Sequence, residues 1–287
     1  MTDIQSNIYK KGDFHIHTNS SDGKLTPTEL IKKASNKGVI DILALTDHDT
    51  TSGVEEAIKA GNAYGIKVIP GIELSTLHKG ESIHILGYFK DASYKKIEFQ
   101  NFLKDMADFR ENRGKKIVDN LLKFFNIKLD YEKILVKSHG IVARPHIAKA
   151  IIEEGYPYSW NYIFDNFIGK DSPAYVANKK VSVDEGIKIL KAVNAVVVLA
   201  HPVLIKKSSI DEMIKFDFDG IEALYYLNSP NDTINFVDAA IKNNKLITAG
   251  SDFHGMEDQD TRHGDVGDIS LTGEPLKAFL RALEIYK

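Results

Sequence analysis

Two hydrophobic patterns alternate along the first third of the chain. A short apolar run rich in β-branched residues, typical of a buried strand, lies at residues 39–45, and a further strand is expected at residues 66–72. Residues 82–88 alternate well enough to predict another strand, which carries His84. Between them, apolar positions spaced three or four apart predict helices over residues 27–37 and 54–64. Thr26 and Ser52 each begin a capping-box sequence at the start of these helices. This alternation predicts a parallel α/β unit, either a barrel or an open sheet.

The pattern becomes helical in the middle of the chain. Residues 97–125 form a long, charged stretch with helical period, and a second helical stretch covers residues 145–154. An aromatic-rich segment follows, with Tyr156, Tyr158, Trp160, Tyr162 and Phe164. We therefore predict a helical insertion domain over residues 92–171 that caps the substrate and interrupts a larger domain made of residues 1–91 and 172–287. The aromatic residues either stack a nucleobase or form the core of the insertion, and the sequence leaves both open.

The α/β pattern returns near residue 181 and continues to the end of the chain. Ser182 is placed to cap a helix that ends near Val193. The remaining expected elements are strands at 195–200, 219–224 and 246–250 and helices at 230–243 and 275–286. The predicted class is therefore α/β.

Composition narrows the chemistry. The 287-residue chain has a formal net charge of −3, which gives no field strong enough to favour a duplex DNA or membrane partner. No apolar run approaches the roughly 20 residues of a membrane span, and we expect a soluble, cytoplasmic protein. Cysteine is absent, which excludes disulfides, thiolate zinc sites and cysteine nucleophiles. Any metal must therefore be bound by histidine and carboxylate side chains.

The first candidate site is the stretch from Asp13 to Asp22. If residues 13–17 form a strand, His15 and His17 point to one side while Phe14 and Ile16 pack on the other. A Ser/Gly-rich turn then allows Asp22 to fold back toward the two imidazoles. Imidazole and carboxylate together suit zinc, iron or manganese.

Further histidines and acids lie on or just beyond the later predicted strands. With the first stretch they make nine candidate ligands: His15, His17, Asp22, His48, Glu73, His84, His201, Asp252 and His254. Because the carboxyl ends of parallel strands form one rim, we expect these side chains to converge. Nine are too many for one ion and suit two or three ions that share a bridging carboxylate. Structural histidines that hydrogen-bond to backbone carbonyls are the alternative.

These segments resemble the successive motifs of the polymerase and histidinol phosphatase (PHP) family. The matching stretches are 15–23, 46–49, 70–73, 83–87, 200–202 and 250–254. The resemblance covers almost the whole chain. Within the family, the sequence is most similar to stand-alone phosphoesterases that act on nucleoside 3',5'-bisphosphates and short 5'-phosphorylated oligonucleotides, and residues 143–146 (Ala-Arg-Pro-His) share in that similarity. The resemblance implies a distorted seven-stranded (β/α) barrel, the PHP fold, with two or three divalent ions in a trinuclear site.

Carried over residue by residue, the resemblance implies a ligand set for each ion. The first ion would be held by His15, His17, Glu73 and Asp252, the second by Glu73, His84 and His201, and the third by Asp22, His48 and His254. The family uses zinc, manganese or iron. No ligand position departs from the family pattern, and the identity of the ion stays open.

The expected reaction is phosphomonoester hydrolysis by a metal-bridging hydroxide, which needs no cysteine or serine nucleophile. Glu73, Asp252 and His201 are the expected catalytic residues. Asp47 and Asp49 are expected to orient His48 or a neighbouring ligand.

Three other residues are expected to contact the substrate. Arg144 is the expected phosphate clamp, because a guanidinium matches phosphate oxygens in a bidentate manner. His146 either supports Arg144 or contacts substrate, and His263 follows the last ligands on a loop. Two alternative functions stay open. One is a small-metabolite phosphatase of the histidinol phosphatase type, and the other is a non-catalytic scaffold braced by metal.

Overall fold

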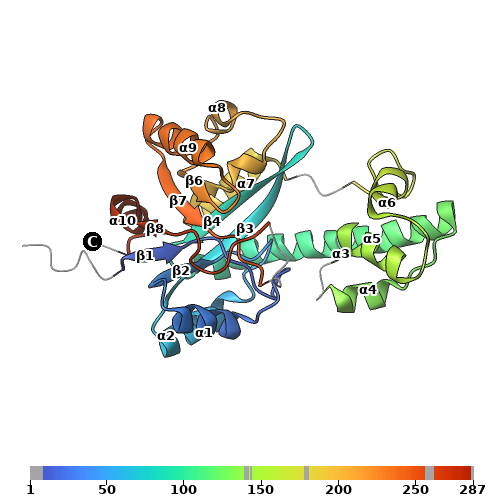
Figure 1. Cartoon of the computed structure of the whole chain (residues 1–287), viewed down its shortest axis with the longest axis horizontal. Coiled ribbons are helices and arrows are strands. Elements are labelled where there is room, and N and C mark those ends of the chain that lie inside the picture. Colours follow the sequence, from blue (N-terminus) through green and yellow to red (C-terminus); the bar gives the residue numbers. More distant parts are fainter. Residues whose placement is uncertain (1–8, 139–141, 143, 178–180, 256–261, 286–287) are drawn as a thin grey trace, which may run out of the picture. The chain divides into compact units, whose positions relative to one another are not determined.

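The computed structural model describes residues 9–138, 142, 144–177, 181–255 and 262–285. It divides into two compact units, one formed by residues 1–100 and 181–287 and the other by residues 101–180 (Figure 1). Ala143 of the predicted substrate-binding motif and Tyr286 of the expected last helix lie outside the described residues. None of the helices in the described ranges combines the length and apolar character needed to cross a membrane.

One sheet organises the first unit. Its eight strands are β1 (Lys11–Asp13), β2 (Ile42–Leu45), β3 (Lys67–His78), β4 (Glu81–Phe89), β5 (Ala195–Leu199), β6 (Gly220–Tyr225), β7 (Leu246–Gly250) and β8 (Leu271–Thr272). They are ordered β7-β6-β5-β4-β3-β2-β1-β8. Pairing is parallel within β1-β2-β3 and within β5-β6-β7, whereas β4 is antiparallel to both of its neighbours and β8 is antiparallel to β1.

The sheet curves until its two ends nearly meet. Phe14, directly after β1, donates its N–H to the carbonyl of Ala249 in β7 at 3.0 Å, and Ile16 forms a parallel bridge with Phe253. The expected α/β barrel is therefore confirmed, with seven strands around the barrel and the two-residue β8 attached outside β1.

Helices flank this barrel (Figure 1). They are α1 (Pro27–Lys37), α2 (Val54–Tyr64), α7 (Val183–Ala192), α8 (Ile210–Met213), α9 (Pro230–Lys242) and α10 (Gly273–Ala282), with short 3₁₀ turns at Ala92–Lys95 and Pro202–Leu204. The expected caps at Thr26 and Ser182 are confirmed, each as a full capping box. The box expected at Ser52 is wrong: Gly53 is the N-cap residue of α2 and no side chain caps the helix.

A cluster of aromatic residues fills the space between the strands and α10. Phe14, Tyr88 and Phe279 meet edge to face, with ring centroids 4.8–6.5 Å apart. All three are fully buried. Phe14 therefore packs away from the neighbouring histidines, as the alternating pattern predicts.

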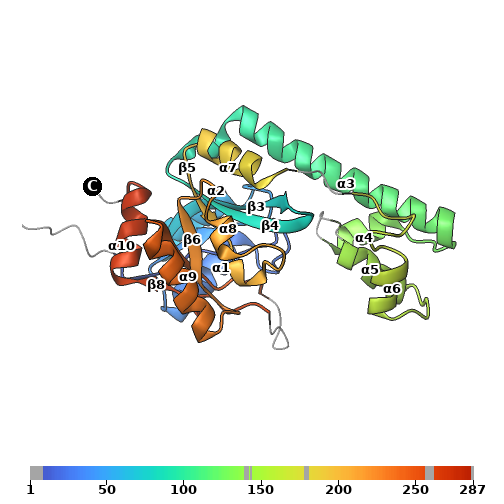
Figure 2. The same ribbon diagram turned by 90° about the horizontal axis from the view of Figure 1, so that it is seen from above.

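The second unit is helical and has its own core. It contains most of α3 (Ile97–Phe125) together with α4 (Tyr131–Lys137), α5 (Arg144–Glu153) and α6 (Trp160–Asn166), and Figure 2 shows the three short helices beside α3. Tyr156, Tyr158 and Phe164 pack against this core. Trp160 and Tyr162 are 44% and 47% exposed, so they retain surface on which a ligand could stack.

Candidate metal centre

The stretch that carries the first two histidines stays extended although β1 ends at Asp13, two residues before His15. Ile16 continues the pairing through its bridge to Phe253, and the N–H of His17 donates to the Phe253 carbonyl at 2.8 Å. Residues 15 and 17 therefore keep strand alternation, and both side chains are fully buried. On its two edges this segment pairs with Phe253 and Thr46, which lie just after the ends of β7 and β2.

Glu73 lies at the centre of the ligand cluster and is 1% exposed. Its Oε2 is 3.0–3.2 Å from His15 Nε2, His17 Nε2 and His48 Nδ1. Its Oε1 is 2.8 Å from His84 Nδ1 and 2.9 Å from His201 Nε2. One carboxylate therefore faces two groups of imidazoles, one through each oxygen.

Glu73 and His84 reach the ligand cluster from positions that are not the carboxyl ends of their strands. Glu73 lies in the middle of β3, not at its end, because β3 continues to His78 in a hairpin with β4. His84 is near the start of β4, and it faces the same rim because β4 runs antiparallel. The predicted ligands converge as expected, but for Glu73 and His84 the carboxyl ends of strands are not the reason.

Two further carboxylates complete the cluster. Asp252 Oδ1 is 3.4 Å from His15 Nε2 and 3.1 Å from His17 Nε2. Asp22 Oδ1 is 3.3 Å from His254 Nε2, and its Oδ2 is 3.6 Å from His48 Nε2. The Asp22 side chain is 38% exposed, so this side of the cluster opens to solvent.

The structure thus brings all nine predicted ligands together. Ligand atoms lie within 4.8 Å of one another in four groups: His15 with His17, Glu73 and Asp252; His17 with Asp22, His48 and His254; His48 with Glu73 and His84; and Asp252 with His254 and His263. His201 belongs to none of these four groups but contacts Glu73 directly. His263 joins the cluster through its ring, which lies 4.1 Å from that of His254.

The donor set fits divalent cations. Several buried ring nitrogens and one carboxylate oxygen have no hydrogen-bond partner among the described residues: His15 Nε2, His17 Nδ1 and Nε2, His48 Nδ1, Glu73 Oε2, His84 Nδ1 and His201 Nδ1. Each such atom costs about 1–3 kcal/mol if it stays unsatisfied. Imidazole and carboxylate without thiolate suit zinc, manganese or iron.

The electrostatics of the cluster also favour positive charge. Burial lowers the pKa of His17, but the close carboxylates of Asp252 and Glu73, 3.1 and 3.2 Å from its Nε2, more than compensate and raise that pKa to about 10. Burial raises the pKa of Glu73, yet the surrounding imidazoles hold that pKa well below its usual value. Without metal, the carboxylates therefore hold protons on His15 and His17, whereas burial lowers the pKa of His84. Cations would compete with these protons for the same atoms.

Asp47 and Asp49 hold the backbone on either side of the ligands. Asp47 accepts hydrogen bonds from the N–H and hydroxyl of Thr18 at 2.7 Å each and from the Ser21 hydroxyl at 2.6 Å, which fixes the turn that carries Asp22. Asp49 accepts from the N–H of Ser75 at 2.7 Å and donates its own N–H to the carbonyl of Glu73 at 2.9 Å. Both contacts therefore fix segments next to ligands.

Three buried residues that touch the ligand segments were not among the predicted site residues. Asp13 accepts from the N–H and hydroxyl of Ser251 at 3.0 and 2.6 Å, and burial raises its pKa to about 6. Glu222 contacts His15, and Tyr225 contacts Asp252. The sequence feature that could have identified Glu222 is a carboxylate inside an otherwise apolar strand.

The predicted substrate residues Arg144 and His146 lie on α5 in the second unit. Arg144 Nη1 donates to the carbonyl of Ile168 at 3.3 Å, and its guanidinium lies 5.7 Å from the ring centroid of Tyr175. His146 is half-buried.

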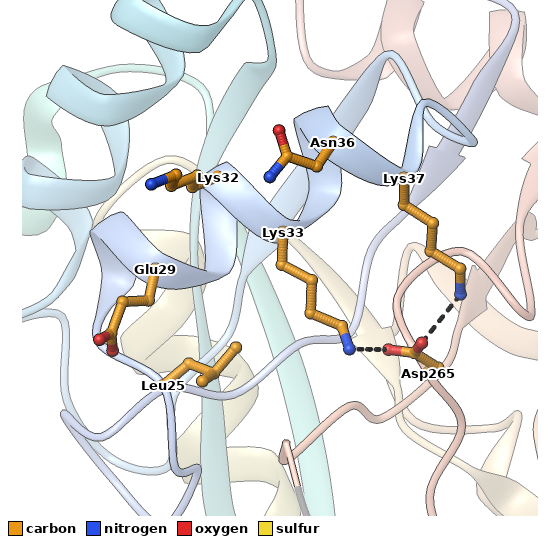
Figure 3. Close-up of a pocket in the computed structure, with 7 residues that line it drawn as sticks. All are labelled: Leu25, Glu29, Lys32, Lys33, Asn36, Lys37 and Asp265. Atoms are coloured by element: carbon orange, nitrogen blue, oxygen red, sulfur yellow. Dashed lines mark hydrogen bonds and ion pairs between the residues drawn. The ribbon is translucent and has the colours of Figure 1, made fainter.

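A surface hollow of about 660 Å³ lies along α1, apart from the nine ligands (Figure 3). Lys33 and Lys37 both pair with Asp265 there, at 3.0 and 3.1 Å. These exposed ion pairs hold the loop near residue 265 against the helix. Contacts of this kind contribute little to stability.

Comparison with known proteins places the chain in a family. The PHP domain matches residues 13–156. A 5'-3' exoribonuclease of Haemophilus influenzae is 34% identical over 67% of this chain and 69% of its own length. A 3',5'-nucleoside bisphosphate phosphatase of Chromobacterium violaceum is 26% identical over 94% of this chain and 96% of its own.

A solved structure supports the same placement. A protein of Bifidobacterium adolescentis, named as a candidate metal-dependent phosphoesterase, superposes with a TM-score of 0.76 and 26% identity over 94% of this chain and 96% of its own. The matched domain, the shared fold and the buried cluster of histidines and acids agree. The chain therefore belongs to the PHP family and is a metal-dependent phosphoesterase.

Proposed function

We propose that this phosphoesterase removes the phosphate of nucleoside 3',5'-bisphosphates or hydrolyses short 5'-phosphorylated oligonucleotides. The observation that carries the proposal is the cluster around Glu73, whose two oxygens face separate groups of imidazoles. Two of the relatives described above are named for a nucleoside bisphosphate phosphatase and an exoribonuclease, and both names concern phosphate esters of nucleotides.

We propose that the cluster holds two or three ions in a trinuclear site, which its four groups of adjacent ligand atoms support. His15, His17 and Asp252 would hold one ion, His84 and His201 the second, and Asp22, His48 and His254 the third. Glu73 would contribute to holding the first two, because its oxygens lie near both groups of imidazoles. When bound, such ions lower the pKa of water, bind phosphoryl oxygens and neutralise charge on the leaving oxygen.

The protein residues have separate tasks in this proposal. Glu73 and Asp252 supply the buried negative charge that holds the ions, and His201 completes the side of the cluster near His84. Asp22 lies on the exposed side, so we infer that substrate enters there. His263 lies beside His254 and would contact the substrate next to the scissile phosphate.

The insertion would recognise the rest of the substrate as a cap. Arg144 is the proposed clamp for a second phosphate, because a guanidinium can contact phosphate oxygens in a bidentate manner, and its cation–π contact with Tyr175 would help to position it. His146 is on the same helix and would support Arg144 or contact the substrate. The exposed faces of Trp160 and Tyr162 are proposed to stack a base.

A substrate panel tests the nucleotide assignment. Purified protein with Mn²⁺ would be assayed on 3',5'-bisphosphoadenosine, short 5'-phosphorylated RNA and histidinol phosphate. We expect the first two to be hydrolysed with higher kcat/KM than the third. Preference for histidinol phosphate would favour a small-metabolite phosphatase instead.

The clamp is tested by Arg144→Ala. We expect this variant to lose kcat/KM for the nucleotide substrates while hydrolysis of a small chromogenic phosphate changes little. Lys149→Ala, on the exposed side of the same helix, is the matched control. Equal losses on both substrates would show that Arg144 acts only in packing.

A further inference from the structure

Strand β6 provides none of the nine predicted ligands, yet two of its side chains contact ligands directly. Glu222 Oε1 is 2.9 Å from His15 Nδ1, and Glu222 Oε2 accepts the backbone N–H of His201 at 2.7 Å. The hydroxyl of Tyr225 donates to Asp252 Oδ2 at 2.8 Å. We propose that β6 is the positioning strand of the metal centre, in which Glu222 and Tyr225 select the ligand atoms that face the ions.

Glu222 determines which nitrogen of His15 is available. A carboxylate accepts hydrogen bonds and donates none, so the ring hydrogen of His15 is held on Nδ1. When a cation replaces the proton on His15 Nε2, this nitrogen is the lone-pair donor, and it lies beside Glu73 and Asp252, which would hold the same cation. A carboxylate behind a ligating imidazole also strengthens its donation to the metal.

The same carboxylate holds the backbone of His201. This residue has φ of 24°, a left-handed value that a residue other than glycine adopts with strain. The hydrogen bond from the His201 N–H to Glu222 Oε2 stabilises that conformation. Glu222 therefore connects ligands from both sides of the cluster, and its side chain is fully buried.

Tyr225 makes the corresponding selection at Asp252. The Tyr225 hydroxyl donates a hydrogen bond to Asp252 Oδ2, whereas Asp252 Oδ1 faces the Nε2 atoms of His15 and His17. Asp252 itself has φ of 54°, so its backbone is also held in an uncommon conformation. The tyrosine hydroxyl thus leaves one carboxylate oxygen for the metal and fixes the other.

A β-bulge explains how both side chains reach the site. Residues 222 and 225 are three apart, and in a regular strand they would point to opposite faces. The register between β6 and β7 shifts between Glu222 and Leu224, so Ala223 is an extra residue. This insertion returns Tyr225 to the face that carries Glu222, because a bulge reverses the alternation.

The inference rests on the proposed metal site, and zinc binding tests the two separately. We would measure the affinity of metal-free protein for Zn²⁺ by competition with a chelating dye, together with thermal unfolding of the metal-free form. Glu222→Gln and Tyr225→Phe should each weaken Zn²⁺ binding about 10–100-fold. Tyr131→Phe is the matched control, since it removes a partly buried tyrosine hydroxyl that donates to a backbone carbonyl, that of Glu111, and not to a predicted ligand.

The outcomes are distinct. Wild-type affinity in Glu222→Gln and Tyr225→Phe, or an equal loss in Tyr131→Phe, would overturn the positioning role. If wild-type protein itself binds no Zn²⁺, the metal site fails and the inference fails with it. If Glu222→Gln does not fold, Tyr225→Phe decides alone. In the zinc-loaded wild type, a nitrogen-15 spectrum should show the His15 hydrogen on Nδ1, and a hydrogen on Nε2 would refute the selection.

Discussion

Gly250 gives the sharpest test of how tightly the metal centre is packed. It is the last residue of β7 and pairs with Tyr225 across the sheet. A Cβ atom at this position would lie 2.2 Å from His15 Cβ and 2.3 Å from Glu222 Oε1. Gly250→Ala therefore places one methyl group against a ligand and against the carboxylate that orients it.

The size of the effect follows from these distances. Ordinary contact begins at about 3.4 Å, so His15 Cβ must move from 2.2 Å by roughly 1.2 Å if it alone gives way. Metal sites hold their ligand distances to within about 0.2 Å, so this shift should weaken zinc binding at least 10-fold. Overpacking costs about 1–3 kcal/mol, and the loss of glycine freedom in the unfolded chain offsets about 0.4–1 kcal/mol. The net cost is then up to about 2.6 kcal/mol, and at roughly 2–4 °C per kcal/mol we expect the metal-free variant to unfold up to about 10 °C lower.

A second glycine separates lost stability from lost metal binding. Gly38, at the end of α1, has φ of 62°, and a Cβ there would meet nothing within 4 Å. Gly38→Ala should cost about 1–2 kcal/mol through backbone strain alone and leave zinc affinity unchanged. Thermal unfolding and zinc competition would be measured for both variants. Wild-type zinc affinity in Gly250→Ala, or an equal loss in Gly38→Ala, would refute the packing argument.

Three further predictions concern the cluster itself. Glu73→Gln should abolish phosphoesterase activity and lower the number of bound ions, and full metal content measured by elemental analysis would contradict the bridging role. Asp47→Asn should weaken zinc binding about 10-fold, because it weakens the hydrogen bonds that fix the turn at Asp22. Unchanged affinity in the competition assay would show that this turn keeps its conformation without Asp47. Because the pKa of His17 is raised to about 10 in the folded state, its contribution to stability is full below pH 6.5 and lost as the pH rises toward 10. Thermal scans of chelator-treated protein should therefore show a falling midpoint over that interval, and a constant midpoint would argue against protons on His17.

The parts of the fold that depend on local pattern could be predicted from the sequence. The long helix over 97–125 and the strand over 246–250 have the expected bounds, because the first has a helical period over its whole length and the second is a short run that ends at Gly250. The convergence of the ligands was also predictable, since candidates recur after successive strands. The missing cap at Ser52 shows the limit of the pattern: the motif is present, but the chain before α2 places Gly53 at the N-cap.

Other parts depend on pairing across the sheet, which no local pattern records. The strands predicted at 66–72 and 82–88 leave out the two-residue turn at Lys79 and Gly80, after which β4 runs antiparallel between β3 and β5. That orientation brings His84 to Glu73. The bulge at Ala223 is equally hidden, because its evidence is the register with β7.

The positions of Glu222 and Tyr225 show why charge inside an apolar strand is informative. A carboxylate that is fully buried needs donors or cations to offset its lost hydration. Glu222 has the ring of His15 and the backbone of His201 as such donors, and both belong to residues that face the ions. The buried charge is therefore accounted for only if the ligand cluster forms around it. The same side chain that is costly in a hydrophobic strand becomes favourable once the metal-binding residues are assembled, so folding of β6 and order at the metal centre are coupled.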